Sequence, residues 1–350
     1  MRRESRQCEE EQVVVESRNP LVVVGVCTPE RRSYAAELAQ GIGGHLIALV
    51  EPMPGRGPQH IVLSPERPSL PQSASPLVVD VDSELDLPHL ALANAPRSSV
   101  ICIVDALHFS HDLGDGRPLS EVAVEGDDRG DFGSRARRAV SHVESATLVS
   151  FVNWETVPTA ELSLLMAITS HLNPTARARL SRGPVEDLRA SLDGGCEPLP
   201  LLERAGWVHA LNDEHDPHMT DPRVTTLRYE QPRPLHPGRL AAALDDIDSG
   251  RWGIVLRSAG FCRLATRLGI LARWDHVGSA IWIDPQSTGQ EDATTAQDLA
   301  LTGLDLDHEG IRLALDAAAV DDDELIAGPH AWRRFTDPLP TWPAIVEEHP

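Results

Sequence analysis

The chain has 350 residues, of which 41% are hydrophobic and 24% are charged, as expected for a globular protein of two ordinary domains. It has no apolar run of about 18 residues and no apolar signal-peptide core near its N-terminus, so we expect a cytoplasmic protein. The formal net charge is −22, and all 31 basic residues are arginine. This charge argues against broad binding to nucleic-acid backbones.

Buried strands alternate with helical patterns in the first half of the chain. We predict strands over 21–27, 45–50, 76–82, 99–106 and 147–153, and helices over 30–40, 84–95 and 159–172. The polar, glycine-rich segment 111–138 is expected to be a surface loop or a short helix, with a local basic patch at Arg135, Arg137 and Arg138. Strands that alternate with helices predict a mostly parallel sheet covered on both faces.

A second, smaller α+β unit is predicted to follow an irregular segment. We expect strands over 223–230, 253–266 and 297–307, and helices over 236–248 and 308–320. The predicted organisation is a tail at 1–18, an α/β domain at 19–195, a linker at 196–223 and a second domain at 224–350.

The first predicted strand and helix have the outline of a phosphate-binding loop, G-x-x-x-x-G-K-[ST]. Gly25 fills the first position. The Gly, Lys and Ser/Thr positions that follow hold other residues, namely Glu30, Arg31 and Arg32. A carboxylate there repels a triphosphate, and Pro29 removes one backbone N–H donor. Ser33 stands one position beyond the place of the magnesium-binding hydroxyl.

The second unit resembles the C-terminal domain of the CobW-like GTPases, a family that includes zinc metallochaperones and cobalamin-synthesis proteins. Three segments match it in order and spacing: "RPLHPGRLAAALDD", "GIVLRSAGFCRLATR" and "QDLALTGLDLDHEGIRLALDAAAVDDDEL". The resemblance runs from about Arg228 to Leu325. Upstream, "SSVICIVDALHF" and "SHLNPTARARL" are similar to segments of the family's first domain. The resemblance implies a degenerate P-loop GTPase-like α/β domain followed by a CobW C-terminal-like α+β domain.

The family's guanine-recognition motif, N-K-x-D, is also altered. Asn153 remains, but Trp154 and Thr156 stand where Lys and Asp belong. Thr156 cannot accept the paired hydrogen bonds that a carboxylate makes with guanine, a loss of roughly 2–5 kcal/mol. The family's C-x-C-C metal motif is absent. We therefore expect no catalytic residues and no cofactor; the alternative is a zinc metallochaperone that binds and hydrolyses GTP with Mg²⁺, using Arg31 or Arg32 in place of lysine.

Three histidines lie beside carboxylates in the predicted linker, in the sequence "HALNDEHDPHM". They are His209, His215 and His218. Imidazole and carboxylate groups suit zinc, but three histidines in a mobile loop define no coordination geometry. We treat them as candidate zinc ligands, against the simpler interpretation of a solvated loop.

The second unit also supplies candidate partner-binding residues. They are Arg233, His236, Arg239, Arg257, Arg267, Trp332 and Trp342. Each has a simpler interpretation. The arginines can pair with the many carboxylates, His236 can cap a helix or pack between the domains, and the tryptophans can fold back on their own domain.

The segment "DDDELIAGPHAWRRFTDPLPTW" is similar to the end of an actinobacterial branch of the family. One protein of that branch recruits a ribosome-hibernation factor to ribosomes during zinc starvation. The resemblance implies a non-catalytic adaptor or recruitment factor linked to zinc limitation, with a protein partner such as a basic ribosome-associated protein. No direct nucleic-acid contact and no membrane contact are expected. A third possibility is a structural partner of an intact paralogue.

Overall fold

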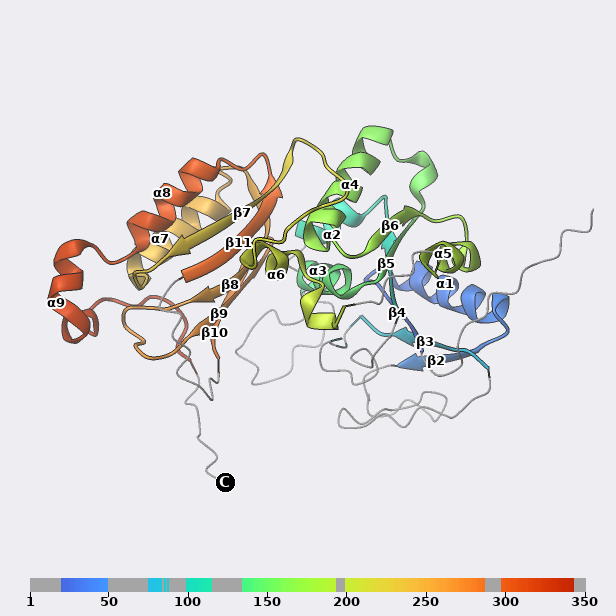
Figure 1. Ribbon diagram of the computed structural model, residues 1–350, viewed down its shortest axis with the longest axis horizontal. Coiled ribbons are helices and arrows are strands. Elements are labelled where there is room, and N and C mark those ends of the chain that lie inside the picture. The colour runs from blue at the N-terminus through green and yellow to red at the C-terminus, as the bar shows by residue number, and fades with distance from the viewer. Residues whose placement is uncertain are drawn as a thin grey trace, which may run out of the picture.

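The computed structural model describes residues 20–49, 75–83, 85, 87, 99–114, 134–192, 199–286 and 297–342. These residues form two units that lie side by side (Figure 1). The predicted tail at 1–18 and nearly all of the predicted helix 84–95 lie outside the described residues. In the part of the chain that is described, no helix has the length and apolar character needed to cross a membrane.

The first unit is built on a six-stranded sheet in which every neighbouring pair is parallel. The strand order is β2-β3-β1-β4-β5-β6. The strands are β1 Leu21–Val24, β2 His45–Leu49, β3 Leu77–Val81, β4 Ser99–Asp105, β5 Leu148–Val152 and β6 Arg177–Leu180. Most of them are continuous apolar runs because helices cover both faces. The predicted mostly parallel sheet is confirmed.

Helices cover this sheet on both sides (Figure 1). They are α1 Thr28–Gly41, α2 Phe109–Gly114, α3 Arg135–Ser145, α4 Thr159–Leu172 and α5 Pro184–Leu192, with a short 3-10 turn η2 at Trp154–Thr156. Alternate residues of β1 face opposite sides: Val23 packs in the cluster under α1, and Val22 and Val24 pack in the cluster under α3 and α4. The described ends of the polar segment 111–138 are helical, since α2 ends and α3 begins within it.

The second unit is an antiparallel five-stranded sheet in the order β10-β9-β8-β11-β7. Its strands are β7 Val224–Gln231, β8 Ile254–Cys262, β9 Ala272–Val277, β10 Ala280–Pro285 and β11 Gln297–Leu304. Helices α7 Pro237–Asp248 and α8 His308–Ala318 cover one face, and α9 Asp322–Trp332 follows them. Leu240, Ile311 and Leu315 fill the core between sheet and helices. The predicted α+β unit is confirmed; β9, β10 and α9 were not predicted.

The other face of the second sheet packs against the first unit. Val224, Leu256 and Val277 belong to the same apolar cluster as the α3 and α4 side of the first sheet. The segment interpreted as a linker holds a 3-10 turn, η3 Leu201–Glu203, and helix α6 Gly206–Leu211, which packs between α4 and the second sheet. A Cβ at Gly206 would lie 2.0 Å from the carbonyl oxygen of His171, so only glycine allows this contact. The two units therefore share one core at their boundary.

Candidate functional site

The turn after β1 is closed by an arginine that reaches back across it. Arg31 stands in the lysine position of the loop, and its side chain is fully buried. Its Nε donates to Asp80 Oδ1 at 2.6 Å, and its Nη1 donates to the carbonyl oxygen of Gly25 at 2.9 Å. Because both partners belong to the protein, this guanidinium is not available to a phosphate.

The next positions of the motif also have their partners within the chain. The Arg32 side chain is 55% exposed, and its Nη2 lies 3.7 Å from a carboxylate oxygen of Asp82. The Ser33 hydroxyl donates to Glu37 at 2.9 Å on the exposed side of α1. Pro29 stands in the first turn of α1, where it has no backbone N–H to offer. The turn thus lacks the lysine, the hydroxyl and one main-chain donor of a phosphate loop.

Carboxylates gather at the ends of β1 and β4. Asp105 ends β4 and lies 2.5 Å from Nδ1 of His108, and Asp112 accepts a hydrogen bond from Arg135 at 2.6 Å. The hydrogen bond and charge of Asp105 raise the pKa of His108, and the charges of Asp112 and Glu30 raise it further. Glu30 is half-buried in the first turn of α1. Glu30 thus adds negative charge beside the turn, whereas Asp105 is paired with His108 and Asp112 with Arg135.

The cavity beneath this turn is very small. Its volume is about 10 Å³, and its walls include Gly25, Cys27, Asp105 and His142. A space of that size holds about one water molecule, whereas ligand pockets span roughly 300–1,000 Å³. His142 is fully buried, neither ring nitrogen has a hydrogen-bond partner among the described residues, and burial lowers its pKa well below the usual range.

The altered guanine motif lies after β5. Asn153 is exposed and adopts a left-handed conformation with φ of 56°. Trp154 turns toward the end of β6, where its Nε1 donates to the carbonyl oxygen of Ser181 at 2.9 Å. Thr156 is exposed. The residue in the lysine position is therefore used for packing and for a bond to the protein backbone.

Taken together, the residues present do not fit GTP with Mg²⁺. A phosphate loop needs bare main-chain donors, a lysine that reaches the phosphates, and a hydroxyl for the metal. At this turn the chain has an internal ion pair, a proline and three nearby carboxylates. The mismatch is present in both the phosphate region and the base-recognition region.

The three linker histidines lie against α4 and not in a free loop. His215 Nε2 donates to the carbonyl oxygen of His171 at 3.0 Å, and His218 Nδ1 lies 3.0 Å from Oγ of Ser170. His209 is in α6, and its buried Nε2 has no hydrogen-bond partner among the described residues. Burial lowers the pKa of His215, and burial together with His215 lowers that of His171 to about 4. In the described ranges, no group of three or more His, Cys, Asp or Glu side chains is arranged to hold a metal ion.

Three of the four candidate partner-binding arginines are engaged in ion pairs within the second unit. The pairs are Arg233–Asp322 at 2.6 Å, Arg239–Glu324 at 2.6 Å and Arg267–Asp337 at 2.9 Å. These pairs join α7, α9 and the segment after α9 to the sheet and its loops. The arrangement agrees with the simpler interpretation, in which the arginines pair with nearby carboxylates.

The other candidates of the second unit also have internal roles. Nδ1 of His236 accepts hydrogen bonds from the first backbone N–H groups of α7, and its ring stacks on Phe335 at 4.3 Å between centroids. Trp332 is only 7% exposed, and its Nε1 donates to the carbonyl oxygen of Glu324. Trp342 Nε1 donates to the carbonyl oxygen of Ile283 at 2.6 Å. Both tryptophans therefore fold back on their own unit.

Arg257 connects the two units. It is 4% exposed on β8, and its Nε lies 2.7 Å from Glu144 Oε1 on α3. Its Nη1 binds Asp275, which Arg137 of α3 also contacts at 2.6 Å. Burial would raise the pKa of Asp275, but Arg257 and Arg137 hold it well below its usual range. Burial raises the pKa of Glu144 despite the attraction of Arg257.

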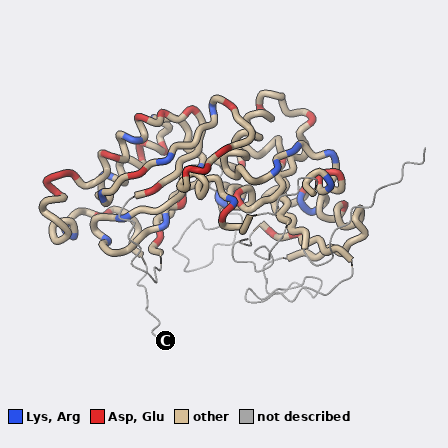
Figure 2. The backbone as a smooth tube through the Cα atoms, in the orientation of Figure 1, with Lys and Arg blue, Asp and Glu red and all other residues tan. Residues whose placement is uncertain are grey.

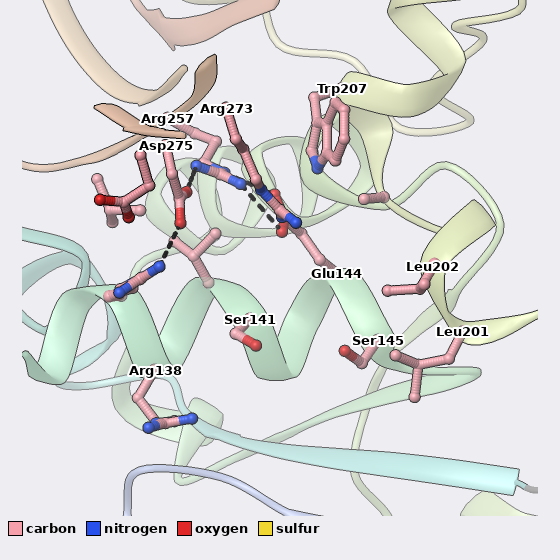
Figure 3. A pocket seen from close by; sticks show the side chains of 15 residues that line it. Arg138, Ser141, Glu144, Ser145, Leu201, Leu202, Trp207, Arg257, Arg273 and Asp275 are labelled. Carbon is pink, nitrogen blue, oxygen red and sulfur yellow. Dashed lines mark hydrogen bonds and ion pairs between the residues drawn. The ribbon is translucent and has the colours of Figure 1, made fainter. Parts of the chain in front are cut away.

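A cavity of about 440 Å³ lies beside this network, and we call it the boundary cavity (Figure 3). Helix α3 forms one wall, the η3–α6 segment forms a second and strand β9 forms a third. Its lining includes Arg138, Ser141, Leu201, Leu202, Trp207, Arg273 and Asp284 in addition to the ion-pair network. Its size is that of a small-molecule pocket.

Fold and site together define a class: a parallel α/β domain with a closed turn after its first strand, joined to an antiparallel α+β domain. Residues 224–319 match the family model "Cobalamin synthesis protein cobW C-terminal domain". The second unit is therefore similar to a CobW C-terminal domain over these residues.

Known proteins similar to the chain include the "Zinc-regulated GTPase metalloprotein activator 1" of Dictyostelium discoideum, at 22% identity over 271 residues. The match covers 69% of this chain and 56% of that protein, so the chain spans about half the length of its curated relative. The family model and this relative support the resemblance to the CobW-like GTPases. The actinobacterial branch stays a prediction.

Two solved structures are also similar. The Zn(II)-bound YjiA GTPase from E. coli has 13% identity and a TM-score of 0.33, over 86% of this chain and 100% of that one. A Zn(II)-bound triple mutant of the YjiA GTPase has 15% identity and a TM-score of 0.30, over 70% of this chain and 71% of that one.

Several residues that decide how both sites work were not predicted from the sequence. Asp80 is a single carboxylate in the apolar strand "LVVDV", a pattern that could have signalled a buried charged partner. Glu144 and Asp275 carry no such local signal, because they meet Arg257 only through the packing of the two units. Arg273 and Trp207 are likewise brought together by tertiary structure alone.

Proposed function

We propose that the chain is a CobW-like protein that does not hydrolyse GTP and acts as an adaptor. The observation that supports this most directly is the buried ion pair between Arg31 and Asp80, with the second bond from Arg31 to the carbonyl oxygen of Gly25. Opening this turn for a triphosphate means separating a buried charge pair and bringing the phosphates toward Glu30. Such a separation costs about 3–5 kcal/mol when one partner is left buried and unpaired.

An adaptor needs a surface for its partner, and α9 offers one. Leu325 and Ile326 are 43% and 85% exposed on this helix. Asp322 and Asp323 stand in its first turn, and carboxylates are frequent along α8 and α9 (Figure 2). An apolar pair beside carboxylates suits a partner with basic side chains around an apolar contact.

The link to zinc limitation and to a ribosome-associated partner comes from the resemblance of the segment 321–342 to the actinobacterial branch. The net charge of −22 supports a basic protein over ribosomal RNA as the contact. A GTP-binding zinc metallochaperone is the second candidate, because the curated relative is named a zinc-regulated GTPase.

The non-hydrolytic part of the proposal is tested by titrating GTP with Mg²⁺ into the full chain by calorimetry and measuring phosphate release. We expect neither binding heat nor turnover. Micromolar binding with turnover would contradict the proposal and favour the second candidate. As a control, the variant Glu30→Gly/Arg31→Lys/Arg32→Thr restores the loop residues, and a gain of affinity in it would locate the defect at this turn.

The adaptor part is tested by carbodiimide cross-linking in a cell extract. The chain has no lysine, so its activated carboxylates couple to amines of a partner and not to side chains of its own. We expect a specific basic protein to be captured, with capture lost in Ile326→Asp and kept in the control Leu107→Asp, whose side chain is 53% exposed on the first unit. Equal capture by both variants would rule out α9 as the contact.

A further inference from the structure

The boundary cavity contains an arginine that has no ion pair among the described residues, although its charge is felt by Glu144 and Asp275. Arg273 on β9 is exposed, and no carboxylate of the described residues lies within ion-pair distance of it. Its guanidinium lies 5.7 Å from the centroid of the Trp207 ring, a weak cation–π arrangement. Arg257, one strand away, is by contrast held by Glu144 and Asp275. Arg273 is therefore a cation of the cavity that is available to a ligand.

The charge of the cavity has the sign opposite to that of the chain. Its lining has four arginines and three carboxylates, an excess of one positive charge, whereas the whole chain carries −22. Among the arginines, Arg137 and Arg257 share Asp275. An anion that enters the cavity thus meets a positive site within an otherwise repelling protein, which favours selective capture at this place.

The wall opposite the charges is apolar. Leu202 is 63% exposed, Leu201 lies beside it, and Trp207 turns one edge toward Phe261 at 6.3 Å between centroids. Figure 3 shows Trp207, Leu201 and Leu202 together on one side, with the arginines and carboxylates on the other. Exposed apolar side chains next to a charged group are typical of pockets that bind ligands with one polar end.

We propose that the boundary cavity binds a small organic anion, whose carboxylate or phosphate group pairs with Arg273 and whose flat apolar body lies against Trp207 and Leu202. The site is formed by both units, with Trp207 and Leu202 from the η3–α6 segment and Arg273 from the second sheet. A ligand there bridges the boundary and stabilises the arrangement of the two units. This site is separate from the turn after β1, so it does not depend on whether the chain binds GTP.

The test is calorimetry on the full chain with three probes that share one ring system: 2-naphthoate, 2-naphthyl phosphate and 2-naphthalenemethanol. We expect one site that takes an anion at least about tenfold more tightly than the neutral alcohol, because a charged hydrogen bond contributes that much. Comparing the carboxylate with the phosphate identifies which anionic group the site prefers. Equal affinity for the alcohol, or no binding of either anion, would overturn the proposal.

Substitutions in the lining of the boundary cavity test whether the anion binds there. Arg273→Met should weaken naphthoate binding at least about tenfold, and Leu202→Gln should weaken it several-fold. Arg251→Met is the matched control, because Arg251 also lies over a tryptophan ring, Trp252, at 5.1 Å but outside the cavity. Arg273→Gln serves as a second substitution if Arg273→Met changes the circular dichroism spectrum. Unchanged binding in both Arg273 variants would overturn the proposal.

Discussion

The turn after β1 and the boundary cavity both place arginines among carboxylates, yet they leave these arginines in opposite states. Arg31 is fully buried and held by Asp80 and Gly25, over a cavity of about 10 Å³. Arg273 is exposed, without an ion pair among the described residues, in a cavity of about 440 Å³. The first arginine stabilises the fold, and the second is available to bind an anion.

The comparison teaches that the residue type alone does not define a binding group. An arginine in the lysine position of a phosphate loop looks like a functional substitute in the sequence. In the structure its side chain is buried, its Nε binds Asp80 and its Nη1 binds the carbonyl oxygen of Gly25. An arginine is structural when protein groups accept its hydrogen bonds and fill the space around it. It can bind a ligand when donors and a cavity beside them are left free.

The largest expected effect is the loss of the ion-pair network between the units. Arg257→Met should lower the free energy of unfolding by about 3–5 kcal/mol, because Glu144, whose side chain is only 13% exposed, loses its arginine partner. Urea denaturation measures this. Arg251→Met, which removes an exposed pair with Asp246, should cost no more than about 1 kcal/mol. A similar small cost for both variants would show that the network does not hold the boundary.

The second-largest effect on stability is expected at the ion pair between Arg31 and Asp80, which closes the turn after β1. Arg31→Met should lower the free energy of unfolding by about 3 kcal/mol, since the buried Asp80 loses its 2.6 Å partner and keeps only the 4.0 Å contact with the exposed Arg32. Arg31→Met/Asp80→Asn should recover part of this loss, because the charge is removed with its partner. A double variant less stable than the single one would contradict the pairing. Arg182→Met, which removes an exposed pair with Glu186, is the control.

A smaller effect is expected at acid pH. The folded chain holds the pKa of His171 at about 4, below its ordinary 6.5, because of burial and the nearby His215. Its neutral form is thus favoured by folding, so this contribution is complete above pH 6.5 and is lost as the pH falls toward 4. We expect a loss on the order of 1–2 kcal/mol, discounted for partial exposure. Urea denaturation across this pH range should show that the free energy of unfolding depends less on pH in His171→Gln than in the original chain. The same pH dependence in both proteins would show that His171 does not make this contribution.

The smallest expected effect is that of zinc. A stoichiometric amount of zinc should leave the melting temperature unchanged within about 1 °C, because His215 and His218 are bonded to α4 and the described residues form no metal-binding group. Scanning calorimetry with and without a chelator measures this. A rise of several degrees that disappears in His209→Ala/His215→Ala would show a zinc site and favour the metallochaperone alternative.

The layers of the fold could be predicted from the sequence because local pattern determines them. Short runs rich in β-branched residues, such as "LVVV" and "VICIV", indicate buried strands, and α4, α7 and α8 show one apolar face. The hairpin of β9 and β10 was missed because its strands contain Arg273, Asp275 and Asp284. These charged side chains lie at the boundary between the two units, so the two strands show no continuous apolar pattern in the sequence.

The sites could be predicted only in part. The sequence shows that the phosphate loop has lost its glycine, lysine and hydroxyl, but it does not show that Arg31 reaches Asp80, 49 residues away. Glu144 and Arg257 are 113 residues apart, and their pairing depends on how two complete units pack. A single chain carries no local signal for such contacts.

The most direct test of a closed turn is a crystal structure of the chain grown with Mg²⁺ and a non-hydrolysable GTP analogue. We predict that Arg31 remains bonded to Asp80 and Gly25, with no nucleotide above the end of β1. A nucleotide seated there, with Arg31 turned outward to its phosphates, would contradict the closed turn and the adaptor function inferred from it.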